Sequence, residues 1–144
     1  MRAVVDTNVV VSAAINPRGT PAQVILAWES GAFTWTISEP LLEELSLTLG
    51  AERVRRYLVW NEALIEDFIL RVRGSADIVA PRHEIHRIVT DPPDNRVVEA
   101  AVEGDAEYIV SGDRDLLDLK HYESTRIVTP AQFLGILATE TTNQ

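Results

Sequence analysis

The chain has 144 residues and a formal net charge of −9, with 46% hydrophobic and 24% charged residues. This length and composition are typical of one soluble globular domain with its own core. The absence of cysteine excludes disulfides and thiolate metal sites. No apolar run approaches the roughly 20 residues of a membrane-spanning helix, and no signal pattern is visible, so we expect a cytoplasmic protein with no membrane partner.

Strand-like and helix-like segments alternate along the sequence. The first is an apolar run from Arg2 that carries one carboxylate, Asp6, and continues as a helix to Ile15. Such a run is typical of a strand buried on both faces, and Thr7 and Asn8 offer a cap for a helix starting at Val9. The other predicted strands are 33–37, 77–79, 108–110 and 126–128, and the other predicted helices are 22–30, 39–49, 52–60, 61–73, 95–103 and 130–137.

This alternation predicts an α/β fold, in which right-handed crossovers build a parallel sheet covered by helices on both faces. The sequence shows no internal repeat and no linker. We therefore expect a single domain over residues 1–138, followed by a polar tail over 139–144.

Two acids follow apolar strands. Asp6 and Asp113 are both expected at the carboxyl edge of the sheet, where open α/β folds bind ligands. For Asp6 alone, a simple helix-capping role is equally compatible with the sequence. The second strand with acids behind it, YIVSGDRDLL with Asp113 and Asp115, favours a site.

Further acids are predicted at the same edge. Glu43 and Glu44 lie early in a helix that opens there, and we favour Glu44, although the helix phase leaves the choice open. Asp94 lies in a turn that opens another helix. Clustered carboxylates repel one another unless cations are present, and oxygen ligands select hard cations such as Mg²⁺ or Mn²⁺. Such ions activate water for displacement at phosphorus.

The basic residues indicate contact with nucleic acid less clearly than the acids indicate a metal site. A net charge of −9 is unfavourable for contact with nucleic acid, but bound cations would offset it locally. Arginines cluster at 53–56 and 71–73, where solvated helix faces are the more common explanation. Lys120 is the only lysine. The histidines His83, His86 and His121 have no cysteine beside them, which disfavours zinc.

The chain resembles the PIN-domain nucleases, and among them the toxin-like bacterial and archaeal branch akin to the VapC toxins. The resemblance rests on the order and spacing of VVDTNVVVSA, SEPLLEEL, DPPDNRVVEAAVEGDAEYIVSGDRDLL and the closing IVTP. It implies a three-layer α/β/α sandwich with a central parallel sheet. It also implies Mg²⁺- or Mn²⁺-dependent endonucleolytic cleavage of RNA by metal-activated water, leaving 5′-phosphate and 3′-hydroxyl ends.

The resemblance also implies the site residues. The four catalytic and metal-binding acids fall on Asp6, Glu44, Asp94 and Asp113, with Asp115 as an additional metal-binding acid. Polar side chains near the substrate fall on Thr7, Asn8, Asn95 and Ser111. Because they are close in sequence to these positions, we add as phosphate contacts Arg18, Arg96 and Arg114. No acid is missing, so we expect an enzyme. Toxin-like relatives imply an antitoxin partner and a homodimer, here through Tyr57, Leu58 and Trp60, for which a place in the core is equally compatible with the sequence.

Three alternatives compete with this interpretation. A receiver-type phosphoacceptor domain needs adjacent acids after the first strand, whereas Thr7 and Asn8 follow Asp6, and it needs a lysine closer to Asp113 than Lys120. A haloacid-dehalogenase-like phosphatase needs an Asp-x-Asp pair, and Asn8 occupies its second position. The third alternative is a non-catalytic RNA-binding or antitoxin-sequestered module on the same fold. The complete set of acids argues against it.

Overall fold

The computed structural model describes residues 1–81 and 92–142, except for the side chains of 92–94 and 141–142. Within these ranges a six-stranded sheet runs in the order β3-β2-β1-β4-β6-β5. The strands are β1 (Arg2–Val5), β2 (Thr34–Ser38), β3 (Asp77–Val79), β4 (Tyr108–Val110), β5 (His121–Tyr122) and β6 (Thr125–Val128). All neighbouring pairs are parallel except β5 with β6. The predicted parallel sheet is confirmed, with one antiparallel edge strand added.

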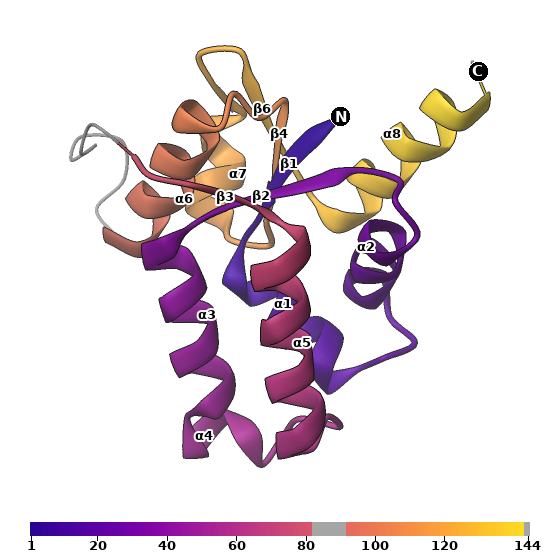
Figure 1. Cartoon of the computed structure of the whole chain (residues 1–144). Coiled ribbons are helices and arrows are strands. Elements are labelled where there is room, and N and C mark those ends of the chain that lie inside the picture. The colour runs from indigo at the N-terminus through magenta and orange to yellow at the C-terminus, as the bar shows by residue number, and fades with distance from the viewer. Residues whose placement is uncertain (82–91, 143–144) are drawn as a thin grey trace.

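Helices cover both sides of this sheet. Figure 1 shows α6 and α7 on one side of the strands and α2 and α8 on the other, which is the arrangement of an α/β sandwich. The helices are α1 (Thr7–Ile15), α2 (Thr20–Glu29), α3 (Glu39–Gly50), α4 (Glu52–Arg55), α5 (Glu62–Ser75), α6 (Pro92–Glu103), α7 (Arg114–Leu119) and α8 (Pro130–Thr142). Within the described ranges, no helix is both long and apolar enough to span a bilayer.

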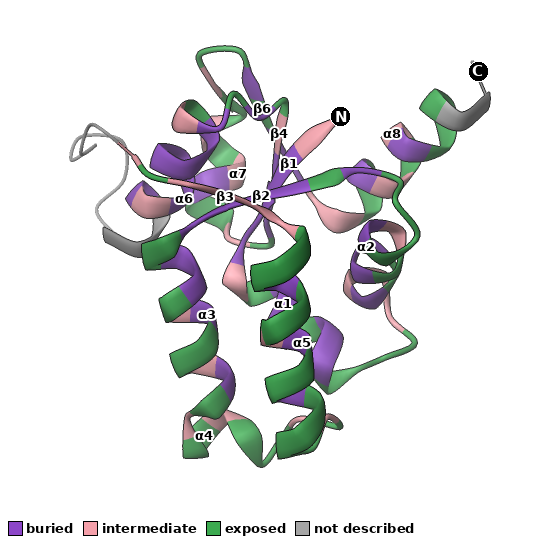
Figure 2. Ribbon diagram, in the orientation of Figure 1, coloured by how far each residue is buried: buried purple, intermediate pink, exposed green. Residues whose placement is uncertain are grey.

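The core lies between the central strands and the helices. Ala3 and Val4 of β1 and Ile109 and Val110 of β4 are completely buried, and Figure 2 shows the central strands largely in the colour of buried residues. Burial on both faces explains why these strands are apolar throughout instead of alternating. The continuous apolar runs therefore identify the centre of the sheet.

An aromatic cluster joins α2, β2 and α5. The rings of Trp28 and Trp35 meet edge to face with centroids 5.1 Å apart, and the Phe68 ring lies 6.2 Å and 6.0 Å from them. Trp60 extends the cluster, with its ring 4.9 Å from that of Phe68. Edge-to-face aromatic pairs stabilise a core beyond the area they bury. This cluster anchors the two helices and the strand to one another.

Several predicted boundaries differ from the structure. The helix predicted over 52–60 ends at Arg55, and the Val59 amide instead donates to the carbonyl of Ala14, 2.8 Å away, so the chain here packs against α1. The first helix begins at Thr7 rather than Val9. The last helix continues to Thr142, beyond the predicted end at residue 137. Predictions for His83 and His86 fall outside the described residues.

Candidate metal and nucleic-acid site

Asp6 lies at the carboxyl end of β1, in the N-cap position of α1. Its side chain makes no capping hydrogen bond to that helix. Instead, its Oδ2 accepts hydrogen bonds from Ser111 Oγ at 2.8 Å and from Asn8 Nδ2 at 3.2 Å. The residue is only 7% exposed. Burying a carboxylate is costly unless polar groups compensate it, so this arrangement removes the alternative in which Asp6 merely caps α1.

Ser111 connects two of the predicted acids. Besides donating to Asp6, its Oγ accepts a hydrogen bond from the backbone amide of Asp113 at 2.9 Å. Asp113 Oδ1 in turn accepts from the amide of Asp115 at 2.9 Å and so caps α7. The loop after β4 is therefore folded by its own polar side chains, and it presents Asp113 half-buried beside the end of β1.

Asn8 fastens this loop to α1. Its Nδ2 donates to Asp6, while its Oδ1 accepts from the backbone amide of Gly112 at 3.2 Å. The two strand ends are also bonded directly, because the Asp6 amide donates to the Val110 carbonyl at 2.9 Å. The carboxyl ends of β1 and β4 thus form one connected polar unit.

Glu44 approaches the same edge from α3. Thr7 Oγ1 donates to Glu44 Oε2 at 3.4 Å, and Glu44 is half-buried while its neighbour Glu43 is exposed. The buried stripe of α3, formed by Leu41, Leu42 and Leu45, sets this phase. Of the two glutamates left open by the sequence, Glu44 is the one that lies beside α1.

The third part of the predicted site is the start of α6. Asp94 lies in the first turn of this helix, which begins at Pro92 instead of after the acid, and its side chain is outside the described residues. Asn95, the next residue, is 6% exposed. One turn further along, the buried Glu99 forms a 2.5 Å ion pair with Arg96. The sequence analysis missed Glu99, although its i,i+3 spacing from Arg96 could have indicated a pair.

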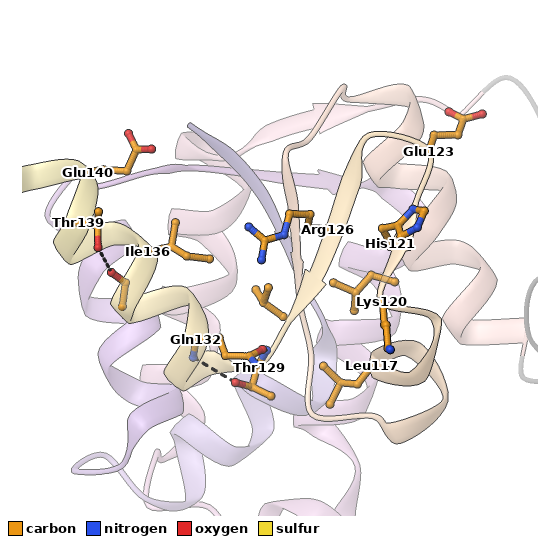
Figure 3. Close-up of a pocket in the computed structure, with 13 residues that line it drawn as sticks. Leu117, Lys120, His121, Glu123, Arg126, Thr129, Gln132, Ile136, Thr139 and Glu140 are labelled. Carbon is orange, nitrogen blue, oxygen red and sulfur yellow. Dashed lines mark hydrogen bonds between the residues drawn. The ribbon is translucent and has the colours of Figure 1, made fainter. Parts of the chain in front are cut away.

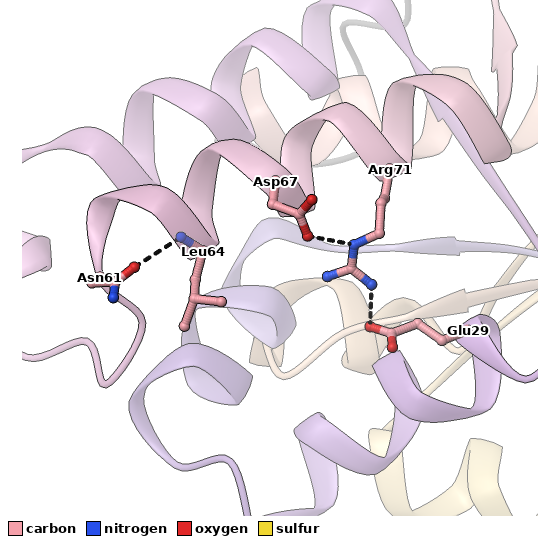
Figure 4. A network of polar contacts seen from close by, with 5 residues as sticks. All are labelled: Glu29, Asn61, Leu64, Asp67 and Arg71. Carbon is pink, nitrogen blue, oxygen red and sulfur yellow. Dashed lines mark hydrogen bonds and ion pairs between the residues drawn. The ribbon is translucent and has the colours of Figure 1, made fainter.

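The predicted phosphate-binding arginines differ in their surroundings. Arg18, in the loop after α1, and Arg114, at the start of α7, are exposed, whereas Arg96 is engaged with Glu99. The arginines of α5 are engaged in ion pairs too: Figure 4 shows Arg71 between Asp67 of its own helix and Glu29 of α2, with both N···O distances 3.0 Å. Arg71 thus cross-links two helices.

The side-chain chemistry at this edge suits a hard cation. The side chains that could bind a metal ion there, those of Asp6, Glu44, Asp113 and Ser111, all offer oxygen atoms. Mg²⁺ and Mn²⁺ prefer oxygen ligands. Among the side chains that the structure describes, no group of three acids or histidines is already close enough to hold a metal ion. Asp94 is not among those side chains, so the described part of the edge supplies two connected acids and a third linked through Thr7.

Comparison with known families decides the classification. A family model described as the PIN domain matches residues 2–115, from β1 to the second residue of α7. The chain belongs to the PIN-domain family. Proteins with PIN domains are generally nucleases and typically use divalent metals. The match includes all five acids predicted to bind metal, and it leaves β5, β6 and α8 outside.

A relative covers nearly the whole chain. The protein is 27% identical over 143 residues to the uncharacterized protein MJ1680 of Methanocaldococcus jannaschii, an alignment that spans 93% of this chain and 90% of that protein. The similarity extends past the family match to the C-terminal strands and helix. The name of this relative states no activity, so the toxin-like branch of the PIN-domain family stays a prediction.

Proposed function

We propose that this PIN-domain protein is an Mg²⁺- or Mn²⁺-dependent endoribonuclease. The observation that carries the proposal is the placement of Asp6, a buried carboxylate at the end of a central strand whose Oδ2 accepts from Ser111 and Asn8 without capping the backbone of α1. Aspartate is rarely buried unless polar groups compensate it, and a carboxylate held in this way at the edge of a sheet is typical of a functional group.

Each side chain has a part in this proposal. Asp6, Asp94 and Asp113 hold a divalent cation, and Glu44 and Asp115 complete its site or hold a second one. A bound cation lowers the pKa of a water molecule and offsets negative charge at phosphorus. Ser111 fixes the relative position of Asp6 and Asp113. Thr7 orients Glu44, and Asn8 keeps the loop after β4 in place.

We extend the proposal to the biological setting that the resemblance implies. The protein is then a cytoplasmic toxin with a cognate antitoxin, and it forms a homodimer. Tyr57, one of the predicted dimer residues, and the neighbouring Val59 are 62% and 64% exposed, and exposed apolar surface supports an interface at this place. Trp60, in contrast, packs on the Phe68 ring, so it contributes to the core.

RNA cleavage tests the chemistry. The purified protein is incubated with a mixed structured and single-stranded RNA pool in Mn²⁺, Mg²⁺ or EDTA, beside Asp113→Asn and Asp118→Asn. Asparagine at 113 removes the charge and still caps α7, while exposed Asp118 of the same helix is a matched control. We expect cleavage only with metal, and a loss in Asp113→Asn larger than the roughly 10–100-fold typical of residues behind a metal ligand.

The outcomes separate the alternatives. Equal cleavage by Asp113→Asn and Asp118→Asn would contradict the assignment of Asp113. Wild-type protein that binds RNA in the presence of Mn²⁺ without cutting it would instead identify the non-catalytic module. Mass spectrometry of the purified protein first shows whether an antitoxin has co-purified, because a bound inhibitor would also prevent cleavage.

A further inference from the structure

A groove of about 990 Å³ lies between α8 and the β5–β6 hairpin. Figure 3 shows α8 along one side, β6 with its hairpin along the other, and the Arg126 side chain reaching into the space between them. The groove lies at the edge of the sheet opposite β3, and neither the family match nor the proposed acids include it. Its length along α8, from Gln132 to Glu140, is about 12 Å at 1.5 Å per residue.

One end of the groove adjoins the acid site. Val128 and Thr129, at the carboxyl end of β6, line it, and the Val128 carbonyl accepts a hydrogen bond from the Ser111 amide at 3.0 Å. Ser111 is the residue that holds Asp6. A strand of nucleic acid lying at the acids can therefore continue into the groove after crossing one β-strand.

The groove holds cations that are not neutralised by the protein. Within residues 1–81 and 92–142, neither Lys120 nor Arg126 takes part in a salt bridge, in contrast to Arg2, Arg55, Arg71, Arg73 and Arg96. Arg126 lies over the Tyr108 ring, 5.8 Å from its centroid, which fixes the stem and leaves the guanidinium N–H groups available. Arginine and lysine free of acidic partners are the groups that bind phosphate.

The backbone at Lys120 adds an independent observation. Lys120 ends α7 with φ +65° and ψ −43°, a positive-φ conformation that glycine adopts with less strain. Backbone strain of this kind clusters at functional sites. The two acids that line the groove, Glu123 and Glu140, lie at the end away from Thr129, as Figure 3 shows.

We propose that the groove between α8 and the β5–β6 hairpin binds the sugar-phosphate backbone of single-stranded RNA next to the acid site. Lys120 and Arg126 contact phosphates, while the half-buried side chains of Leu117 and Ile136 offer apolar surface to unstacked bases. The acids at the outer end repel phosphate and so limit the bound strand to the inner part of the groove. This inference rests on the proposed function, because it names where that substrate binds.

The proposal is tested by measuring RNA binding under conditions that prevent cleavage. Fluorescence anisotropy of a labelled, unstructured RNA 20-mer is measured in EDTA, from about 50 to about 300 mM salt, with wild type and the double variant Lys120→Gln/Arg126→Gln. The matched control is Arg53→Gln/Arg56→Gln, in α4 and directly after it, which also removes two exposed cations. One of them, Arg56, lies over a tyrosine ring, 5.3 Å from the centroid of Tyr57. Single variants and thermal melts accompany both, so that a folding defect in one variant leaves the other interpretable.

We expect the groove variant to bind about tenfold more weakly or worse, with a log–log salt slope smaller by about 1.4, since each phosphate contact on a single strand contributes about 0.7. The control variant should bind like wild type. Equal RNA affinity and equal salt slope for wild type and groove variant would contradict RNA binding in the groove. Wild-type protein that does not bind the 20-mer would contradict it too. If wild type cuts RNA in Mn²⁺ and the groove variant binds RNA normally, the proposal for the groove is wrong and the proposed nuclease activity stands. If the groove variant loses RNA binding and wild type never cuts RNA, the proposed nuclease activity is wrong and the groove stands.

Discussion

A single hydroxyl group, Ser111 Oγ, holds both the buried carboxylate of Asp6 and the backbone amide of Asp113. Its removal takes away one of the hydrogen bonds to the Asp6 carboxylate in a nearly dry environment, where a lost hydrogen bond costs about 1–3 kcal/mol. It also releases the loop that carries Asp113. Both acids then lose their relative position, although neither is itself changed.

Ser111→Ala is therefore expected to weaken Mn²⁺ binding and RNA cleavage by about 10–100-fold, the range for residues that orient metal ligands. Calorimetric titration with Mn²⁺ measures the first effect and the cleavage assay the second. Ser12→Ala, at an exposed serine on α1, is the control and should match wild type. Normal Mn²⁺ affinity in Ser111→Ala would show that the acids are positioned without it.

Lys120 allows stability and binding to be separated at one residue. Lys120→Gly relieves a left-handed φ of +65°, so we expect unfolding to require about 1 kcal/mol more free energy. This gain corresponds to a melting temperature about 2–4 °C higher for a domain of this size. The same change removes a phosphate contact, so RNA binding in EDTA should weaken. A variant that is less stable, or that binds RNA as well as wild type, would contradict this expectation.

At this scale the sequence predicts residue types better than contacts. The place of Asp6 at the sheet edge could be predicted because it directly follows an apolar strand, and that of Glu44 because its helix opens at the same edge. The double role of Ser111 could not be predicted, because it depends on the path of the loop that brings its hydroxyl between two residues 107 positions apart, Asp6 and Asp113. Loop paths leave no periodic signal in a sequence.

Between elements, the end of α6 approaches strand β2 closely at Gly104. A Cβ atom built on Gly104 would collide with the Thr36 side chain, and it would also lie 3.1 Å from the Ala100 carbonyl. Arg2 of β1 donates to the Gly104 carbonyl at 2.7 Å. Glycine at this position thus lets α6 end directly against the sheet, and α6 is the helix that carries Asp94.

Gly104→Ala is expected to lower the free energy of unfolding by about 1–3 kcal/mol, because overpacking forces the backbone or Thr36 to move. Gly74→Ala is the matched control: Gly74 lies inside α5 and an added Cβ meets nothing within 4 Å. Alanine there should raise stability by about 0.5–1 kcal/mol through helix propensity. Urea unfolding of both variants measures the two changes, and changes of the same sign would contradict the packing argument.

Helices and strands were predicted correctly where the hydrophobic pattern extended over many residues. The helix from Glu62 to Ser75 was located to within two residues at each end, and Asn61 caps it, with its Oδ1 accepting from the Leu64 amide at 2.9 Å. The two-residue strand β5 could not be predicted, because His121 and Tyr122 are too few to show alternation. The helix predicted over 52–60 failed because a tertiary hydrogen bond, from Val59 to α1, outweighs local propensity.

For the whole molecule, the proposed cation site links metal binding to the stability of the fold. A ligand that binds only the folded state stabilises it by about 2.7 kcal/mol at a concentration of 100 times its Kd. For a domain of this length that gain corresponds to a melting temperature about 5–10 °C higher. We expect Mn²⁺ to produce such a shift in wild type and EDTA to reverse it.

Asp6→Asn should lose most of the shift, since it removes a ligand charge from the centre of the site. Asp118→Asn, outside the site, should keep it. Differential scanning calorimetry with and without Mn²⁺ measures both, and it requires no RNA. An equal shift in wild type and Asp6→Asn would place the cation elsewhere on the molecule.

The pairing of β1 with β4, and of β4 with β6, also fixes when the site can form during synthesis. Asp6 is made early, but the Ser111 hydroxyl that holds it follows 105 residues later, and the Ser111 amide is bonded to Val128 in turn. Contacts so distant in sequence form late, after the cost of closing the loop has been met. A ribosome-bound chain therefore carries an unassembled edge until β6 has emerged. Any chemistry at these acids must therefore wait for a strand that follows Asp6 by more than a hundred residues.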